Sequence, residues 1–330
     1  MSNFNEIISF YRDDLEKVNQ IILDNSIGKS NLILEITQNL INSGGKRIRP
    51  LLLIISSNLC GSKKSDSFLN LAAAVEMIHT ATLLHDDVVD MSEIRRGKKT
   101  ANALWDNKSA ILVGDYLFSL SFQLMVKSQN LEVLELLAKT SSIIADGEVL
   151  QLQNSHNLNI SKEQYFEIIF GKTAVLFSAC TEVGALINNL PQSKILAMKN
   201  LGKNLGMIFQ IIDDILDYSS DQKILGKDIG NDFFEGKVTL PIIETYCQAD
   251  IQEKKLIEEI FAKNICDNNK NFDDFAKILT LINKYHALDS CLKIADELAI
   301  QAKNNLEIFE KNIFSLQLEY IIDYSLKRLS

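Results

Sequence analysis

Proline and glycine are scarce in this 330-residue sequence, which contains only three prolines and fourteen glycines. Valine and isoleucine do not alternate with polar residues over any useful length, so no strand is expected. Apolar residues instead recur at i, i+3, i+4 and i+7 along nearly every segment, which is the spacing of an amphipathic helix. We therefore expect a single all-α domain over residues 1–330, a bundle of about ten or more helices around a deep central cavity.

The expected elements follow from this periodicity and from the positions of the polar breaks. Helices are expected at residues 3–24, 29–42, 50–60, 66–91, 108–128, 130–153, 161–188, 193–219, 237–248, 251–263, 271–284, 287–310 and 312–328. Loops are expected at residues 43–49, 61–65, 92–100, 154–160, 189–192, 220–236 and 264–270. None of these loops has the composition of a linker between domains.

Cysteine is sparse and unpatterned, with five residues and no CxxC spacing. An odd number at irregular intervals excludes a disulfide framework or a zinc knuckle, so reduced thiols are expected. The histidines do not form a metal triad either. The cysteines are Cys60, Cys180, Cys247, Cys266 and Cys291, and the histidines are His79, His85, His156 and His286.

Basic residues are outnumbered, and the net charge of −9 argues against a nucleic-acid binder, because phosphate backbones attract basic surfaces. The most apolar run, Leu51–Ile55, is far too short to span a bilayer. The first residues are acidic and amphipathic, without the basic start and apolar core of a signal peptide. We therefore expect a cytoplasmic protein without stable membrane insertion.

Two aspartate clusters carry most of the information, DDVVD starting at Asp86 and DDILD starting at Asp213, each after a long apolar stretch. Buried carboxylates are costly without a compensating positive charge, and neither cluster contains Lys or Arg. On a helix Asp86 shares a face with Asp90, and Asp213 with Asp217. Mg²⁺ converts the repulsion between such carboxylates into shared coordination, and substrate phosphates often complete its shell. We interpret the clusters as halves of one divalent-metal site for a phosphorylated substrate; the alternative is two solvated acidic helix ends.

Cations accompany both clusters. The turn GGKRIRP places Lys46, Arg47 and Arg49 where glycines allow close backbone approach and a helix begins. Arg95 and Arg96 follow the first aspartates and could hold a diphosphate against the metals. Basic loops are common on surfaces, so the GGKRIRP turn by itself is a modest signal.

Three lysines extend this pattern. Lys172 lies in an otherwise apolar helix, and Lys227 and Lys237 lie in a loop that also carries Asp228 and Asp232. Such loops often close over bound phosphates as lids. For Lys172 the alternative is a surface lysine whose stem packs on apolar neighbours. Two anionic substrates that meet at Mg²⁺ in a helical cavity are the simplest interpretation.

Two histidines lie near the first cluster. His79 is two helical turns before Asp86 on roughly the same face, which makes it a candidate for substrate contact. His85 adjoins Asp86 and is expected to pack or to form a hydrogen bond.

The sequence resembles the trans-isoprenyl diphosphate synthases in motifs that stand in that family's order and spacing: GGKRIRP, LLHDDVVDMSEIRRGK, GKTA, FQIIDDILD and GKDIGNDFFEGKVTLP. The resemblance covers residues 30–245 strongly and is greatest to bacterial octaprenyl diphosphate synthases. It implies the isoprenoid synthase fold, a homodimer and a Mg²⁺-dependent prenyltransferase. Isopentenyl diphosphate would be condensed repeatedly onto an allylic diphosphate, farnesyl diphosphate giving octaprenyl diphosphate for quinone side chains.

The resemblance also implies residue roles. The ligands of about three Mg²⁺ ions are Asp86, Asp90 and Asp213, with Asp217 nearby and Asp87 and Asp214 in support. The allylic diphosphate contacts Arg95, Lys172, Lys237 and Lys227. Isopentenyl diphosphate contacts Lys46, Arg49, His79 and Arg96. The reacting centre is lined by Thr173 and Gln210. A salt bridge explains Arg47 equally well.

Product length is predicted from the residues that precede the first cluster. Thr82 and Ala81 lie about 6–8 Å beneath the Asp86 carboxylate at 1.5 Å per residue. An aromatic side chain there would form a floor, as in the family's short-chain members, whereas Ala and Thr leave a tunnel open. We therefore expect a long-chain product.

Several alternatives stay open. Within the same chemistry the chain could be a farnesyl or geranylgeranyl diphosphate synthase. A terpene cyclase usually carries a different second metal motif, and a non-catalytic partner subunit should have lost aspartates or the arginine pair. A purely structural helical bundle would not bind diphosphate with magnesium. The C-terminal residues, Tyr324–Arg328, lack a clear basic tail, so no role is assigned to Lys327 or Arg328.

Overall fold

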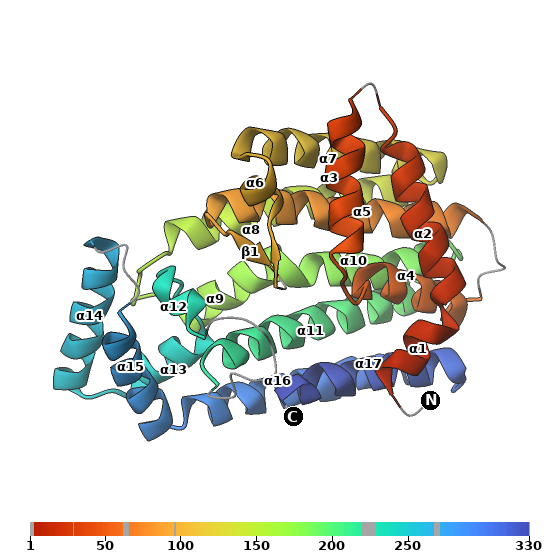
Figure 1. Ribbon diagram of the computed structural model, residues 1–330. Helices are drawn as coiled ribbons and strands as arrows, with labels where there is room; N and C mark the ends of the chain where they lie inside the picture. The colour runs from red at the N-terminus through yellow and green to blue at the C-terminus, as the bar shows by residue number, and fades with distance from the viewer. Residues whose placement is uncertain are drawn as a thin grey trace. The chain divides into compact units, whose positions relative to one another are not determined.

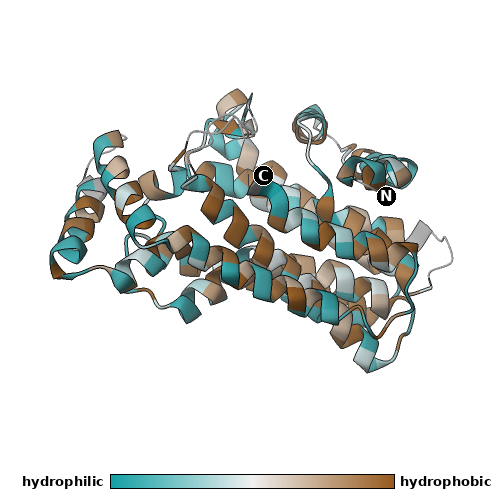
Figure 2. Cartoon of the chain, turned by 90° about the horizontal axis from the view of Figure 1, so that it is seen from below, coloured by the Kyte–Doolittle hydropathy of each residue, from teal (hydrophilic) through white to brown (hydrophobic). Residues whose placement is uncertain are grey.

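The computed structural model describes residues 3–28, 30–61, 66–95, 97–219, 229–266 and 271–329. Within these residues the chain is almost entirely helical (Figure 1), which confirms the all-α prediction. Brown and teal residues alternate along the helices in Figure 2, as amphipathic periodicity requires. The deep central cavity stays a prediction.

The chain divides into two compact units. Unit 1 comprises residues 1–141, 176–202 and 305–321, and unit 2 comprises residues 142–175, 203–304 and 322–330. Four helices contribute residues to both units: α8 (Leu131–Gln153), α10 (Val175–Leu186), α11 (Gln192–Asp217) and α17 (Ile313–Leu326). The assignment of residues 1–330 to a single domain stays a prediction.

Unit 1 is built around the long helix α5. Its elements are α1 (Phe4–Phe10), α2 (Arg12–Asn25), α3 (Asn31–Asn42), α4 (Ile48–Leu59), α5 (Asp66–Val89), α6 (Ala101–Leu104), α7 (Asn107–Lys127) and most of α10 (Val175–Leu186). Helix α5 packs against α7, α4 and α2. Ala72, Ala73 and Ala74 of α5 are fully buried, so small side chains at these positions serve close helix packing.

Unit 2 contains a helix interrupted by a π-helical turn and several further helices. Its elements are α9 (Lys162–Ile169), a π-helical turn (Phe170–Ala174), α12 (Asn231–Phe234), α13 (Leu240–Gln248), α14 (Ile251–Cys266), α15 (Phe272–Lys284) and α16 (Ala287–Asn304), followed at the C-terminus by a 3₁₀ turn (Lys327–Leu329). Helix α13 packs against α16 and α15. Phe233 of α12 stacks edge-on against Phe261 and also contacts Phe275, which anchors this four-residue helix in the core.

The structure corrects several expected boundaries. The helix expected at 3–24 is interrupted at Tyr11, whose buried hydroxyl donates to Gln317 Oε1 over 2.7 Å. The helix expected at 161–188 contains the π-helical turn, and the helix expected at 287–310 ends at Asn304. Part of the loop expected at 220–236 forms α12. Tertiary contacts decide these positions, and local periodicity does not report them.

The expectation that no strand forms is wrong for a short hairpin. Strands β1 (Ile94–Arg95) and β2 (Lys98–Lys99) pair antiparallel, with Ile94 opposite Lys99. Gly97 takes a φ of 73° in the turn between them, a conformation that glycine adopts readily. Strands this short carry too few residues for an alternating pattern to be visible.

Two of the described helical segments are long and apolar enough to cross a membrane by length and composition, Asn107–Lys127 and Lys162–Leu186. The apolar window of the second is 83% buried inside the protein, as in a core helix. The four cysteines whose side chains are described are unpaired, in agreement with the expectation of reduced thiols.

Candidate active site

The first aspartate motif ends helix α5 in unit 1. Asp86 lies in its last turn, Asp90 follows directly after the helix, and both are partly exposed. Asp87 points inward, is buried, and accepts a hydrogen bond from Arg95 Nε over 2.8 Å. Burial raises the pKa of Asp87, and the Arg95 guanidinium offsets part of that rise. The motif therefore divides into two outward carboxylates and one inward carboxylate that holds Arg95 on the β-hairpin.

The two arginines of the GGKRIRP turn have different partners. Arg47 has a φ of 48° and donates through Nη1 to the buried Glu76 over 2.8 Å and through Nη2 to the Ile41 carbonyl over 3.0 Å. The salt-bridge alternative for Arg47 is therefore confirmed. A basic side chain buried in this way holds the turn rather than reaching a substrate.

Arg49 and His79 are brought together, although thirty positions separate them. Arg49 Nη1 lies 3.0 Å from His79 Nε2, and the guanidinium stacks 4.9 Å from the ring centroid of Phe177. Lys46 Nζ lies 5.9 Å from the Phe4 ring centroid. Arg96 lies outside the described residues.

His85 packs as expected. Its Nε2 lies 3.2 Å from the Ile111 carbonyl of α7 and 3.4 Å from Asp115. A Cβ atom at Gly114 would come within 2.4 Å of the same nitrogen, so only glycine leaves room for the imidazole. Two turns deeper in α5, Ala81 is buried, and Thr82 Oγ1 donates to the His79 carbonyl over 2.8 Å.

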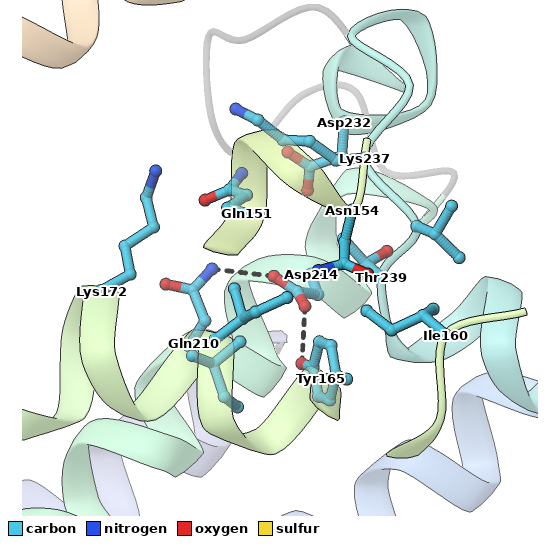
Figure 3. A pocket seen from close by; sticks show the side chains of 13 residues that line it. Gln151, Asn154, Ile160, Tyr165, Lys172, Gln210, Asp214, Asp232, Lys237 and Thr239 are labelled. Carbon is cyan, nitrogen blue, oxygen red and sulfur yellow. Dashed lines mark hydrogen bonds between the residues drawn. The ribbon is translucent and has the colours of Figure 1, made fainter. Parts of the chain in front are cut away.

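Unit 2 contains a pocket (Figure 3). Its polar lining comes from α8 and the residue after it, from the α9–π segment, from α11, from α12 and from the segment before α13. The lining residues are Gln151, Asn154, Ile160, Tyr165, Ile168, Ile169, Lys172, Gln210, Asp214, Asp232, Lys237, Val238 and Thr239. Three predicted site residues, Lys172, Gln210 and Lys237, therefore share one pocket.

A chain of hydrogen bonds runs along the pocket. Thr173 Oγ1 donates to Gln210 Oε1 over 2.7 Å, and Gln210 Nε2 donates to Asp214 Oδ1 over 2.8 Å. Tyr165 Oη donates to the other oxygen of Asp214 over 2.7 Å, as the dashed lines in Figure 3 partly show. Burial raises the pKa of Asp214 well above its usual range, and the two donated hydrogen bonds oppose that rise. The order of donors and acceptors fixes the orientation of the Gln210 amide.

The π-helical turn sets the position of Lys172 and Thr173. A Cβ atom at Gly147 of α8 would lie 2.6 Å from the Lys172 backbone nitrogen, and one at Gly171 would lie 2.9 Å from the Gly147 Cα. Two glycines thus let the backbones cross in contact, at the point where the helix bulges. Lys172 Nζ lies 2.8 Å from Glu148 Oε2, and the partly exposed lysine side chain lines the pocket.

The aspartates of the second motif have different partners from those of the first. Asp217 accepts hydrogen bonds from the backbone N–H groups of Asn231 over 3.1 Å and of Asp232 over 2.9 Å, and so holds the start of α12. The metal role expected for Asp217 stays a prediction. Lys237 Nζ lies 2.6 Å from Glu235 Oε2. Lys227 and Asp228 lie outside the described residues.

Sequence analysis missed two side chains of unit 2. Arg328 Nη2 lies 2.7 Å from Asp213 Oδ1, and its guanidinium stacks 4.3 Å from the Phe209 ring centroid. Tyr165 anchors Asp214, as described above. The C-terminal basic pair was a visible signal for Arg328, whereas a single tyrosine on an amphipathic helix gives no signal.

Each of the two aspartate motifs carries carboxylates of the kind that a hard divalent cation takes. Among the described residues, no three His, Cys, Asp or Glu side chains gather closely enough to hold a metal ion. Mg²⁺ usually takes one or two protein carboxylates and completes its shell with water and phosphate oxygens. The partly exposed carboxylates of Asp86, Asp90 and Asp213 fit that requirement.

Comparison with known proteins identifies the family. Residues 30–279 match the polyprenyl synthetase family. The chain is 36% identical over 324 residues to an all-trans-nonaprenyl-diphosphate synthase (geranyl-diphosphate specific) from Rhodobacter capsulatus, covering 98% of both chains. It is 35% identical over 312 residues to an octaprenyl diphosphate synthase from Haemophilus influenzae, covering 94% of this chain and 93% of the relative.

A solved structure agrees. The polyprenyl synthase from Caulobacter crescentus, complexed with calcium and isoprenyl diphosphate, matches with a TM-score of 0.92 at 40% identity, over 99% of this chain and 98% of that chain. Because the family match covers residues 30–279 and the similarity in fold covers nearly the whole chain, the chain belongs to the polyprenyl synthetase family.

Proposed function

We propose that this chain is a long-chain trans-polyprenyl diphosphate synthase that condenses isopentenyl diphosphate repeatedly onto an allylic diphosphate. Farnesyl diphosphate is the proposed primer, octaprenyl diphosphate the product, and quinone side chains its use. The observation that carries the proposal is the pocket of unit 2, where Lys172 and Lys237 accompany the hydrogen-bonded series from Thr173 to Asp214. Cations beside a fixed polar wall suit an anionic leaving group.

Mg²⁺ is the proposed cofactor, about three ions for each active site. Asp86, Asp90 and Asp213 would supply its carboxylate ligands, and Asp217 remains a further candidate. When bound, the ions would neutralise the departing diphosphate and so favour ionisation of the allylic C–O bond. Calcium in the Caulobacter crescentus complex supports a divalent, oxygen-liganded site.

The cations of the chain would bind the two substrates separately. Lys172, Lys237 and Arg95, with Lys227, would hold the allylic diphosphate through charge-assisted hydrogen bonds. Isopentenyl diphosphate would contact Lys46, Arg49, His79 and Arg96. Arg49 Nη1 donates to His79 Nε2, which holds the imidazole beside the guanidinium and supports a shared anion site for these two residues.

The reacting carbons would lie beside Thr173 and Gln210. Their hydrogen bond holds both side chains in one arrangement, so that neither needs to reorganise during the reaction. The apolar residues Ile160, Ile168 and Ile169 line the same pocket and would exclude water, which would otherwise quench a carbocation.

Homodimer formation and a cytoplasmic location, without stable membrane insertion, are also proposed. Ile111, Leu112 and Val126 of α7 are exposed and lie within about 100° of one another around the helix. An exposed apolar stripe of this kind favours a second copy as its cover. Light scattering should give twice the chain mass, and Leu112→Glu should give the monomer; a wild-type monomer would contradict the dimer.

The first test mixes the purified protein with farnesyl diphosphate, labelled isopentenyl diphosphate and Mg²⁺, and sizes the products by mass spectrometry. A ladder ending near octaprenyl diphosphate is expected. A stop at farnesyl or geranylgeranyl diphosphate would retain the chemistry and reject the long-chain product. If no Mg²⁺-dependent product formed, the alternative of a non-catalytic partner subunit would gain support.

A further inference from the structure

His156 follows helix α8 in an unusual backbone conformation. Its φ of 60° lies in the left-handed region, which residues other than glycine adopt uncommonly, although asparagine, aspartate and histidine do so more often than the rest. Its backbone N–H donates to the Gly236 carbonyl over 2.7 Å. The end of α8 is therefore tied directly to the turn that precedes α13.

The imidazole lies directly against Gly236. A Cβ atom at this glycine would lie 2.0 Å from His156 Cε1 and 2.2 Å from Nε2, so no other residue leaves room for the ring. Gly236 itself has a φ of 72°. Ring and glycine are complementary in shape, and replacement of either would open the contact.

Hydrogen bonding accounts for only part of the polar surface of the His156 ring. The Nδ1 atom is buried and has no hydrogen-bond partner among the described residues. Burial lowers the pKa of His156, and a hydrogen bond with the Phe261 backbone offsets part of this effect. A buried ring nitrogen without a hydrogen-bond partner costs free energy. The ring therefore contributes at this position mainly through the way its shape fits against Gly236.

The turn held by His156 presents Lys237. The Gly236 N–H donates to the Phe233 carbonyl over 3.0 Å, and the Lys237 N–H donates to the Asp232 carbonyl over 2.8 Å. Lys237 then enters the pocket near Gln151 and Asn154 of the α8 end, as Figure 3 shows. Because Lys237 is adjacent to Gly236, a shift of the turn would move its ammonium group.

We propose that His156 is a positioning residue, which locks the Glu235–Lys237 turn so that Lys237 is held in place before substrate binds. The catalytic consequence rests on the proposed function, whereas the lock itself does not. A lid that orders only around substrate is the opposite arrangement, and it would leave this turn without such a contact. When Lys237 is already held in place, substrate binding does not have to supply the conformational entropy cost of ordering its side chain.

His156→Asn is the informative variant, because asparagine tolerates the left-handed conformation but cannot cover Gly236. His286→Asn is the matched control, since His286 also has a positive φ of 50° in unit 2 but is exposed and pairs with Asp289. Hydrogen exchange should become at least about tenfold faster at Gly236 and Lys237 in His156→Asn only. Unchanged exchange at both amides would overturn the lock.

A double-mutant cycle tests the link to Lys237. Binding of inorganic pyrophosphate with Mg²⁺, measured by calorimetry, should weaken about tenfold in His156→Asn, because small misplacements of a cation are costly. In a Lys237→Ala background the same change should have almost no further effect. An equal loss in both backgrounds would reject positioning through Lys237 in favour of a general structural role. If wild type bound pyrophosphate but made no product, the proposed function would fail and the positioning result would stand.

Discussion

Tyr165 supports the buried carboxylate of Asp214, and both residues line the pocket of unit 2. Asp214 is 2% exposed, and both its oxygens accept hydrogen bonds from within unit 2. Removal of one donor would leave a buried carboxylate oxygen unsatisfied, which costs about 1–3 kcal/mol. The same loss would release the Gln210 amide from its single orientation.

Tyr165→Phe is therefore expected to lower the free energy of unfolding by about 1–3 kcal/mol and to reduce kcat. Urea denaturation and steady-state kinetics would measure both effects. Tyr246→Phe is the control, because its hydroxyl also donates to a carboxylate, Glu258, but on the exposed surface. That variant should change stability by less than about 0.5 kcal/mol. Equal effects in the two variants would contradict a special role for the buried pair.

Ala81→Tyr is expected to shorten the product. Ala81 is buried about 6–8 Å beneath the Asp86 carboxylate along α5, so an aromatic ring would block a chain growing past it. Mass spectrometry of the products should show the ladder ending several units earlier, whereas Ala81→Ser should preserve the full length. An unchanged ladder in Ala81→Tyr would refute the open-tunnel argument.

At the scale of elements, the crossing of α8 with the π-helical turn controls where Lys172 lies. Gly147→Ala would push a methyl group to 2.6 Å from the Lys172 nitrogen, so the two backbones must separate. We expect a loss of about 1–3 kcal/mol in stability and a raised KM for the allylic substrate. Ser142→Ala, at an exposed position of the same helix, should leave both quantities unchanged. A Gly147→Ala variant with wild-type KM would show that the crossing does not place Lys172.

The contact between α14 and the end of α15 should depend on pH. Hydrogen bonds from Lys284 and Tyr285 lower the pKa of Glu253 to about 2. Because the folded-state pKa lies below the ordinary value of 4.5, the ionised group stabilises the fold above about pH 4.5. That contribution is lost as pH falls through 2.

The corresponding measurement compares the Tm of wild type and Glu253→Gln from pH 7 to pH 2. The wild-type advantage should be present at neutral pH and should vanish near pH 2. Glu259→Gln on the exposed face of the same helix serves as the control. A difference in Tm that stayed constant over the whole range would show that Glu253 acts through something other than its charge.

At the scale of the whole molecule, binding of metal and diphosphate should stabilise the fold. A ligand that binds only the native state adds about 2.7 kcal/mol at one hundred times its Kd. Mg²⁺ with inorganic pyrophosphate should therefore raise Tm, and EDTA should reverse the rise. Asp213→Asn should lose most of it, whereas Asp146→Asn on the exposed side of α8 should retain it. A full rise in Asp213→Asn would exclude that carboxylate as a ligand.

Much of this protein was predictable from local pattern. The 3.6-residue periodicity identified the helical class, and the spacing of two DDxxD motifs with their neighbouring cations indicated a diphosphate site. The family match and the fold agree with those expectations. A pair of carboxylates at i and i+4 can be predicted from the sequence, because the helix that carries both fixes the distance between them.

The sequence by itself determined the all-α class, the approximate helices and the residue types of the candidate site, because all of these depend on neighbours along one helix. Only the tertiary structure decided that Arg47 forms a salt bridge with Glu76, that Asp217 accepts hydrogen bonds from the start of α12 and that His156 packs against Gly236. Each of these partners lies at least fourteen residues away in the sequence. Which donor meets which acceptor is settled by packing between elements, and no local period encodes that choice.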